Sequence, residues 1–443
     1  MNPLLLATLL LPALAEDAAP TPTPETTPEP AAAPDIVAEA EVVLFEIDAH
    51  TTGVYIPDHR APLVDVWVQV PVGQWDEGLM DSGGLEAWTN QFDDPAATLR
   101  SRADERAMQL AAGLRTGRSI LYLGCLAEDL PEAKTLLGDI FANRAYDEAQ
   151  FKRDAKSNEK SWELEQKDPA SVRDRAVMAL SFSETDPRQL EPTPYALPVR
   201  DSDTLAQLRD RMLQTPGRYV AFAGDLTIEQ ARDFATGLLP PADPSITWTE
   251  MPVEPLRERP DRHVVPLANT NQAYLDYFQM GPSTSDQHYP AWLVAQHVLG
   301  GHFFSRISVA LRHDGGDTYS ASAYSNVDNT STPAGIVTFT RADNLDATEK
   351  KVKDTLATFH AEGITAQELD EAVRYFRGKA LMRTQTPEQL LTRTMYNLGN
   401  DKPLAWHVND PAPMAQLTLE DVNAVIREHF DPADFTMVVV VPE

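Results

Sequence analysis

Two hydrogen-bond donors, Arg312 and Tyr319, lie seven residues apart on either side of the pair Gly315 and Gly316. A guanidinium and a phenol can both be aimed at a peptide carbonyl or at a developing oxyanion. The spacing predicts that Arg312 ends a helix and that Tyr319 begins the next strand, with the glycines allowing a sharp connection. A structural role is the alternative, because an arginine at a helix C-terminus complements the helix dipole and Tyr319 would then be a half-buried strand residue.

The other residue types with catalytic chemistry form no recognisable site. None of the ten histidines belongs to a His-x-x-x-His or His-x-x-Glu-His motif, and His297 and His302, five apart, fit one helical face poorly. Cys125 is the only cysteine, which excludes an internal disulfide, and its apolar surroundings in residues 120–126 predict an inert core thiol. A stand-alone hydrolase with another site has no Gly-x-Ser-x-Gly elbow or cysteine–histidine arrangement to support it.

The elements that must position Arg312 and Tyr319 alternate between strands and helices. Residues 64–70 alternate valines with Asp65, Trp67 and Gln69, which predicts a strand with one buried face. Further strands are predicted over 219–223, 274–280, 336–340 and 435–441, and helices over 103–116, 131–142, 288–299 and 304–313. The Thr227-x-x-Gln230 and Thr365-x-x-Glu368 pairs predict the starts of two more helices.

The order of elements repeats along the chain. The helix pattern at Thr204, Leu205, Leu208 and Met212 recurs 214 residues later, and in both places a strand follows. A shared pattern of this kind indicates an internal duplication. We therefore predict two domains, residues 37–240 and residues 263–443, joined by a linker over 241–262 that is rich in proline and charge.

The chain is strongly acidic, with 37 basic and 67 acidic residues and a formal net charge of −30. A field of this sign repels phosphate backbones, so no nucleic-acid partner is expected. It suits a soluble protein that meets basic peptides.

The N-terminus has the pattern of an export signal. An apolar run ends at Ala13-Leu14-Ala15, a small-x-small cleavage site, although no basic residue precedes it. The run is too short to span a bilayer, which takes about 20 residues. We expect residues 1–15 to be a signal peptide, 16–36 a disordered spacer rich in proline, threonine, alanine and glutamate, and the protein to be periplasmic or extracellular, with no membrane span after cleavage.

Two segments resemble the pitrilysin/insulinase family of zinc metallopeptidases, in particular the branch of the mitochondrial processing peptidase. Residues 72–88 are similar to the family's strand, glycine-rich turn and His-x-x-Glu-His helix, but Gly83 and Ala87 stand at the two histidine positions and only Glu86 is kept. Hydrogen and methyl side chains donate no lone pair. The resemblance therefore implies a degenerate zinc motif and no metal in this chain, which Glu159 and Glu163, near the third ligand position, cannot rescue.

The second segment, residues 300–320, resembles the family's C-terminal signature, in which an arginine and a tyrosine seven residues apart contact the substrate main chain. The match assigns that substrate-binding role to Arg312 and Tyr319, while Arg306 is expected in a structural salt bridge. Residues 193–199 and 219–225 also resemble family segments, so that the likeness runs from about residue 41 to residue 443.

The resemblance implies an α+β fold of two homologous domains, each a mainly antiparallel sheet with helices packed on one face. It further implies a non-catalytic, zinc-less subunit of a heterodimeric metallopeptidase, not a peptidase on its own. A homologous partner would carry the zinc, and an unfolded peptide would be the substrate. The alternative is a non-enzymatic scaffold or assembly subunit in which Arg312 and Tyr319 are relics.

Overall fold

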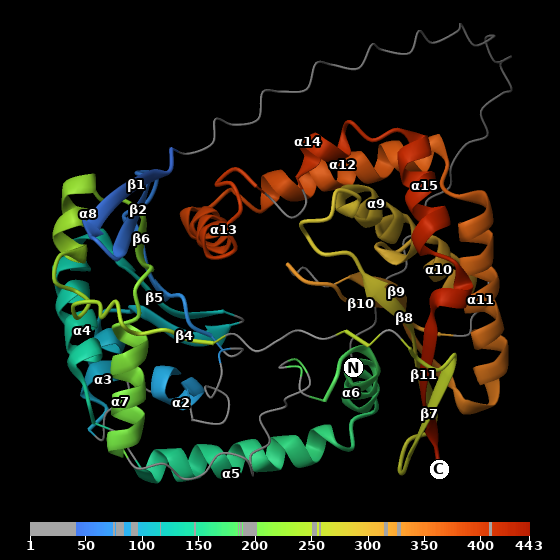
Figure 1. Ribbon diagram of the computed structural model, residues 1–443, viewed down its shortest axis with the longest axis horizontal. Coiled ribbons are helices and arrows are strands. Elements are labelled where there is room, and N and C mark those ends of the chain that lie inside the picture. The colour runs from blue at the N-terminus through green and yellow to red at the C-terminus, as the bar shows by residue number, and fades with distance from the viewer. Residues whose placement is uncertain are drawn as a thin grey trace, which may run out of the picture. The chain divides into compact units, whose positions relative to one another are not determined.

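The computed structural model shows two β-sheets with helices packed against them (Figure 1). The residues it describes are 41–73, 76, 84–89, 96–115, 117–145, 148–184, 186, 188, 202–249, 255, 256, 258–313, 318–325, 329–406 and 410–443.

The first sheet contains six strands in the order β1-β2-β6-β3-β5-β4. Their bounds are β1 Val43–Asp48, β2 Thr51–Pro57, β3 Leu63–Val70, β4 Gln109–Arg115, β5 Arg118–Leu126 and β6 Arg218–Gly224. Only β2 and β6 pair in parallel, and the other neighbours are antiparallel.

The second sheet contains five strands in the order β7-β11-β8-β10-β9. Their bounds are β7 Arg262–Leu267, β8 Gln272–Gly281, β9 Ala321–Ser325, β10 Thr332–Arg341 and β11 Thr436–Pro442. Here β7 and β11 are the parallel pair. Matching β2 through β6 with β7 through β11 reproduces the same order and directions, with β1 as an additional edge strand. The predicted fold class, a duplicated and mainly antiparallel α+β architecture, is thus confirmed.

The helices follow the same repeated order. Those before the second sheet are α2 Gly84–Thr89, α3 Thr98–Glu105, α4 Leu130–Ala142, α5 Glu148–Glu165, α6 Pro169–Ser181, α7 Ser202–Leu213 and α8 Ile228–Ala235. Those after β8 are α9 Tyr289–Gly300, α10 Arg306–Ser308, α11 Leu345–Glu362, α12 Ala366–Met382, α13 Pro387–Gly399, α14 Pro411–Met414 and α15 Leu419–His429. Capping boxes at Thr227 and Thr365 start α8 and α12 as predicted.

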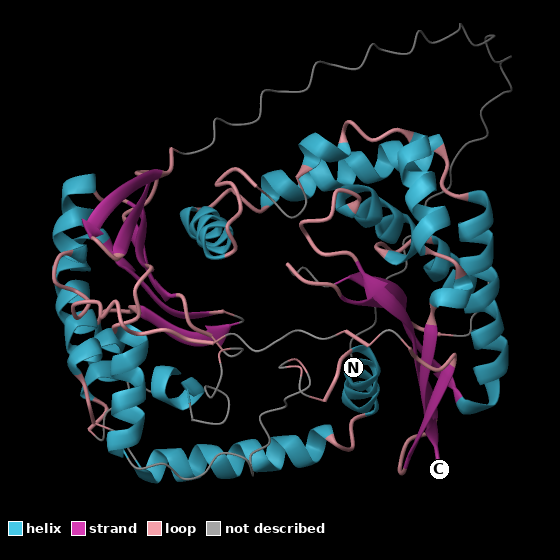
Figure 2. Ribbon diagram, in the orientation of Figure 1, coloured by secondary structure: helices cyan, strands magenta, loops and turns pink. Residues whose placement is uncertain are grey.

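Helices cover both faces of the first sheet (Figure 2). On one face, valines of β3 and leucines of β5 pack with α4, as expected from the alternation in residues 64–70. On the other face, Leu390, Leu391 and Met395 of α13 pack on Val54 and Ala221. The sequence predicted helices on one face only, because the small apolar patch that receives α13 belongs to strands far from it in the chain.

The second sheet has a reciprocal arrangement. One face packs with α9, α11 and α15, whose apolar residues form a continuous core with β8 and β10. The other face receives α6, an early helix, through contacts of Val177 with Phe278 and Val438. Each half of the duplicated topology therefore contributes one helix to the sheet of the other half.

One predicted helix is wrong. Residues 103–116 were expected to be helical, but α3 ends at Glu105 and residues 109–115 form the edge strand β4. Alanine, leucine, methionine and arginine in this stretch favour a helix locally. Pairing with β5 along its whole length overrides that preference, as tertiary context often does.

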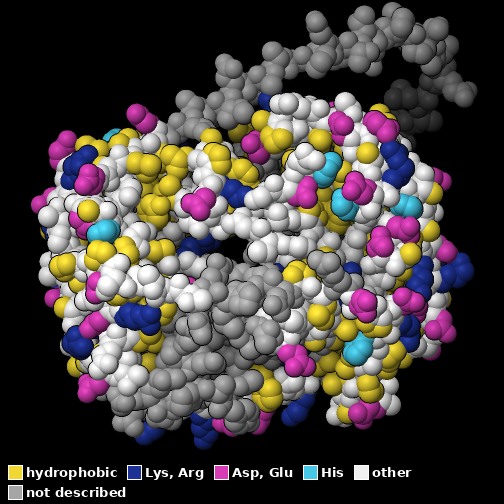
Figure 3. All heavy atoms as spheres, in the orientation of Figure 1, with side chains coloured by type: hydrophobic (Ala, Val, Ile, Leu, Met, Phe, Trp, Pro, Cys, Tyr) yellow, Lys and Arg dark blue, Asp and Glu magenta, His cyan; other side chains and the backbone are white. Residues whose placement is uncertain are grey.

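The surface charges are mixed. On the face seen in Figure 3, acidic side chains are scattered among basic ones rather than gathered into one patch. Within the described part of the chain, every helix is too short or too polar to cross a lipid bilayer.

Candidate functional site

The structure brings Arg312 and Tyr319 together. Arg312 lies in a π-helical turn, Val309–His313, and Tyr319 lies two residues before β9. The guanidinium carbon of Arg312 is 5.1 Å from the centre of the Tyr319 ring and 4.1 Å from that of Phe303. Tyr319 is 78% exposed. Among the described residues, neither the guanidinium nor the phenol hydroxyl has a hydrogen-bond partner.

Buried apolar anchors and close helix packing fix the turn that carries Arg312. Ile307 and Leu311 are fully buried in the second core. A Cβ on Gly300 would lie 2.2 Å from the backbone nitrogen of Ala323, so only glycine allows α9 to approach β9 so closely. The predicted helix over 304–313 is present as α10 followed by the π-turn, a distortion that is frequent at functional sites.

Arg306 has the structural role expected from the sequence. Its guanidinium makes two hydrogen bonds to Glu368, with Nε–Oε1 and Nη2–Oε2 distances of 2.9 and 2.8 Å. Glu368 also accepts the backbone N–H of Thr365 in the capping box of α12. The pair ties the turn after α9 to the start of α12.

The residues of the degenerate zinc motif do not fit a metal. Ala87, in α2, is 6% exposed and contributes only a methyl group, while the neighbouring Trp88 donates its indole N–H to the carbonyl of Ile120 at 2.7 Å. Gly83 and the side chain of Glu86 lie outside the described part of the chain. Within that part, no group of three histidine, cysteine, aspartate or glutamate side chains could hold a metal ion.

His297 and His302 are adjacent in space, although their spacing fits one helical face poorly. Their ring centres are 4.8 Å apart because His302 follows the end of α9, where the chain turns back. The His297 ring also stacks on Tyr375 at 4.2 Å. Burial is the main cause that lowers the pKa of His297 to about 4, and the charges of His302 and Lys379 act in the same direction. The ammonium group of Lys379 would repel a metal cation at these rings. We therefore assign both imidazoles to packing.

Cys125 is an inert core thiol, as predicted. It is buried in β5. Burial is the main cause that raises its pKa to about 12, and the negative charges of Asp129 and Asp65 raise it further. A thiol of this kind is almost entirely protonated at neutral pH, and it is the thiolate that reacts.

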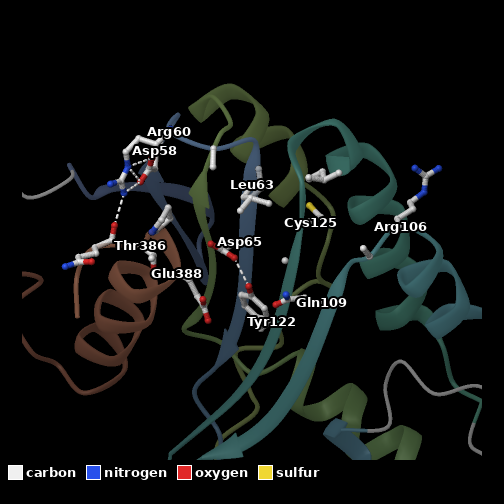
Figure 4. Close-up of a pocket in the computed structure, with 17 residues that line it drawn as sticks. Asp58, Arg60, Leu63, Asp65, Arg106, Gln109, Tyr122, Cys125, Thr386 and Glu388 are labelled. Carbon is white, nitrogen blue, oxygen red and sulfur yellow. Dashed lines mark hydrogen bonds and ion pairs between the residues drawn. The ribbon is translucent and has the colours of Figure 1, made fainter. Parts of the chain in front are cut away.

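A cavity that the sequence did not predict lies between the first sheet and the start of α13. It has a volume of about 680 Å³, and Asp65 on β3, Tyr122 on β5 and Glu388 on α13 reach it (Figure 4). The polar alternation of Asp65, Trp67 and Gln69 was the only local signal. It predicted one buried face with these three residues on the other, whereas Gln69 is only 2% exposed and its amide lies beside Gly399 at the end of α13.

Comparison with known proteins identifies related chains. A family model described as "Peptidase M16 inactive domain" matches residues 201–376, which include Arg312 and Tyr319 but not the degenerate motif at residues 83–87. An "Uncharacterized zinc protease YmxG" of Bacillus subtilis (strain 168) is 27% identical over 191 residues, 42% of this chain and 46% of that protein. A "Non-peptidase homolog YmxG" of Helicobacter pylori is 25% identical over 240 residues, 54% of this chain and 55% of that protein. The chain thus spans about half the length of the curated relatives it matches.

Solved structures share the fold. The peptidase M16 inactive domain from Pseudomonas fluorescens superimposes with a TM-score of 0.79 and 18% identity, over 91% of this chain and 98% of that chain. The periplasmic protease PqqL from Escherichia coli gives a TM-score of 0.73 and 13% identity, over 93% of this chain but only 48% of that chain. At these identities the likeness shows the fold alone.

Proposed function

We propose that this chain, which belongs to the pitrilysin/insulinase family of zinc peptidases, is a non-catalytic subunit that binds peptide through Arg312 and Tyr319 beside a zinc-bearing partner. One contrast supports the proposal. Where the family's zinc peptidases have a metal-binding histidine, this chain has the buried methyl group of Ala87. In the other half, Arg312 and Tyr319, which are unpaired among the described residues, lie together at the surface.

The geometry suits recognition of a main chain. The ring of Phe303 and the ring of Tyr319 contact the guanidinium of Arg312 and restrict its orientation without using its N–H groups. These N–H groups and the exposed phenol hydroxyl can then donate to a peptide carbonyl. Neither group has the chemistry of a general base at neutral pH, so the pair binds and orients peptide rather than cleaving it.

The partner would be a homologue that keeps both imidazoles, the glutamate and the zinc ion. The similarity to PqqL supports pairing, because this chain matches about half of that longer periplasmic protein. In the proposed pair, the homologous partner would contribute a second unit of the same fold. Cleavage would then require both chains, with zinc in the partner and no cofactor in this chain.

Export is part of the proposal. The apolar run before Ala13-Leu14-Ala15 supports signal cleavage after residue 15. N-terminal sequencing of the mature protein from its native host should begin at Glu16. A mature chain that still begins at Met1 would contradict export by this signal.

The test of pairing is affinity isolation of the chain from its native envelope fraction. We expect one stoichiometric partner with an intact His-x-x-Glu-His motif, and peptide cleavage by the pair that neither separated chain performs. Isolation of the chain alone, or with partners that all lack that motif, would contradict the proposed function.

A scaffold without enzymatic function is the second candidate. The name "Non-peptidase homolog" carried by the Helicobacter pylori relative favours it. In that case the complex isolated from the envelope would contain no zinc peptidase. The Arg312→Ala variant would then leave the assembly of that complex and any activity of its other subunits unchanged.

A further inference from the structure

We propose that the cavity between the first sheet and α13 binds a lysine or arginine side chain of a peptide, with the carboxylates of Asp65 and Glu388 facing its charged end. This site is separate from Arg312 and Tyr319. It rests on the proposed function and extends it by naming a side chain that the peptide would carry.

Arg60 links two walls of the cavity. Arg60 makes hydrogen bonds to both carboxylate oxygens of Asp58, at 2.9 and 3.0 Å from Nε, and donates to the carbonyl of Gln385 at 2.8 Å. Gln385 immediately precedes Thr386, the N-cap of α13. The loop between β2 and β3 is therefore linked to the beginning of α13 beside the cavity (Figure 4).

Among the described residues, the charges in the cavity leave two carboxylates without a cation. Arg60 is paired with Asp58, and Arg106 is paired with Asp129 outside the cavity. Asp65 accepts a hydrogen bond from the Tyr122 hydroxyl at 2.6 Å, and Glu388 has no ion-pair partner in the part of the chain that the structure describes. In Figure 4 the Glu388 side chain points from α13 into the space that Asp65 also faces.

The charge of Glu388 acts on Asp65. Burial raises the pKa of Asp65, and the charge of Glu388 raises it further, although the hydrogen bond from Tyr122 acts in the opposite sense. Burial, then Asp65, also raises the pKa of Tyr122. A bound cation between Asp65 and Glu388 would relieve their repulsion, because an opposite charge at close range favours the ionised form.

The rest of the lining fits an aliphatic stem. Leu63, Cys125 and Leu126 form an apolar wall beside the carboxylates. The methylene groups of lysine or arginine can pack on such a wall while the charged head reaches polar groups. A small inorganic cation would leave that apolar surface unused.

A second cavity indicates that the ligand is a chain rather than a small amine. It has a volume of about 400 Å³ and shares Tyr122 and Glu388 with the first. Its walls include the rings of Trp67 and Tyr396 and also two cationic side chains, Arg115 and Arg118. Two cavities that meet at Tyr122 and Glu388 fit a ligand long enough to enter both, as a peptide can and a small amine cannot.

The test measures binding by the full mature chain. A blocked, fluorescein-labelled peptide, acetyl-Ala-Leu-Lys-Leu-Ala with the dye at its C-terminus, is titrated by fluorescence anisotropy. It is compared with a peptide in which norleucine replaces the lysine, which removes the ammonium group and keeps the four-carbon stem. We expect the lysine peptide to bind about tenfold more tightly, and Glu388→Gln to abolish most of that preference, as for loss of one charged partner. Equal affinity for both peptides would overturn the proposal.

Matched controls test whether the preference for lysine arises in this cavity. Glu420→Gln removes an exposed carboxylate on α15 and should leave both affinities unchanged, whereas an effect equal to that of Glu388→Gln would refute a local site. Free cadaverine should compete only at far higher concentration, and competition at the peptide's own Kd would overturn the assignment to a peptide.

Asp65→Asn is a second variant that should also weaken the preference for the lysine peptide. Because binding is measured without turnover, failure here would leave the role of Arg312 and Tyr319 standing, and failure of that role would leave this binding intact.

Discussion

The connection from β3 to β4 and the connection from β8 to β9 occupy equivalent places in the duplicated topology, but they carry different chemistry. The first contains α2, where Ala87 is buried and Trp88 is tied to β5. The second contains α9 and the turn that presents Arg312 and Tyr319 to solvent. The comparison teaches that the fold fixes where a functional segment lies, while a few side chains decide whether that segment binds metal, binds peptide or only packs.

The largest expected effect concerns the second connection. In the pair reconstituted with its zinc-bearing partner, Tyr319→Phe or Arg312→Ala should lower the peptide turnover number by about 10²–10³, or about 2.7–4 kcal/mol, as for loss of one oxyanion donor. Measuring initial rates with saturating peptide tests this. Ala87→Ser, in the first connection, serves as the matched variant and should leave turnover unchanged. Rates that are equal for Tyr319→Phe and the unaltered pair would remove the functional contrast between the two connections.

An intermediate effect separates two arginines within the second connection. Arg306→Ala should lower the free energy of unfolding by about 1–3 kcal/mol, because it leaves the partly buried Glu368 without its ion-pair partner. Arg312→Ala, which removes no ion pair among the described residues, should cost below about 1 kcal/mol. Urea denaturation of the isolated chain measures both. A larger loss for Arg312 than for Arg306 would show that Arg312 is a structural residue.

The last prediction concerns one of two acidic residues that lie under the helices exchanged between the halves. Asp276 on β8 accepts hydrogen bonds from the Tyr324 hydroxyl at 3.1 and 3.2 Å, as Asp65 does from Tyr122. Burial raises the pKa of Asp276 to about 7, against the opposing charge of Arg173 on α6. Asp174 on the same helix raises it slightly.

The sign of the pH dependence follows from that shift. A carboxyl whose folded-state pKa exceeds its unfolded value of about 3.9 stabilises the fold fully below pH 4 and loses this contribution as the pH rises through 7. Asp276→Asn should therefore remove a downward slope of at most about 1.4 kcal/mol per pH unit between pH 5 and 7. Urea denaturation across this range measures the slope, and an unchanged slope in the variant would assign it to other groups.

Local patterns predicted much of the fold. The valine alternation of β3 and the capping boxes of α8 and α12 depend on neighbours in the chain, and these elements form where expected. The strand β4 was missed because its residues favour a helix and only pairing with β5 makes it extended. The exchange of α6 and α13 was missed because their contacts join residues far apart in the chain.

The candidate site was predicted in part. The spacing of Arg312 and Tyr319 indicated both residues, although the stacking of Phe303 on the guanidinium could not be read from sequence. The cavity at Asp65, Tyr122 and Glu388 combines three elements that meet only in the folded chain. No local signal distinguishes Glu388 from any other acidic residue in the first turn of a helix.

The metal content of the purified chain tests the division of chemistry between this protein and its partner most directly. After expression with added zinc and desalting, inductively coupled plasma mass spectrometry should find well below one zinc ion per chain, and no peptide cleavage should be present for a chelator to inhibit. Added partner should bring both the zinc and the activity. One tightly bound zinc ion per isolated chain, together with cleavage that 1,10-phenanthroline abolishes, would contradict the account.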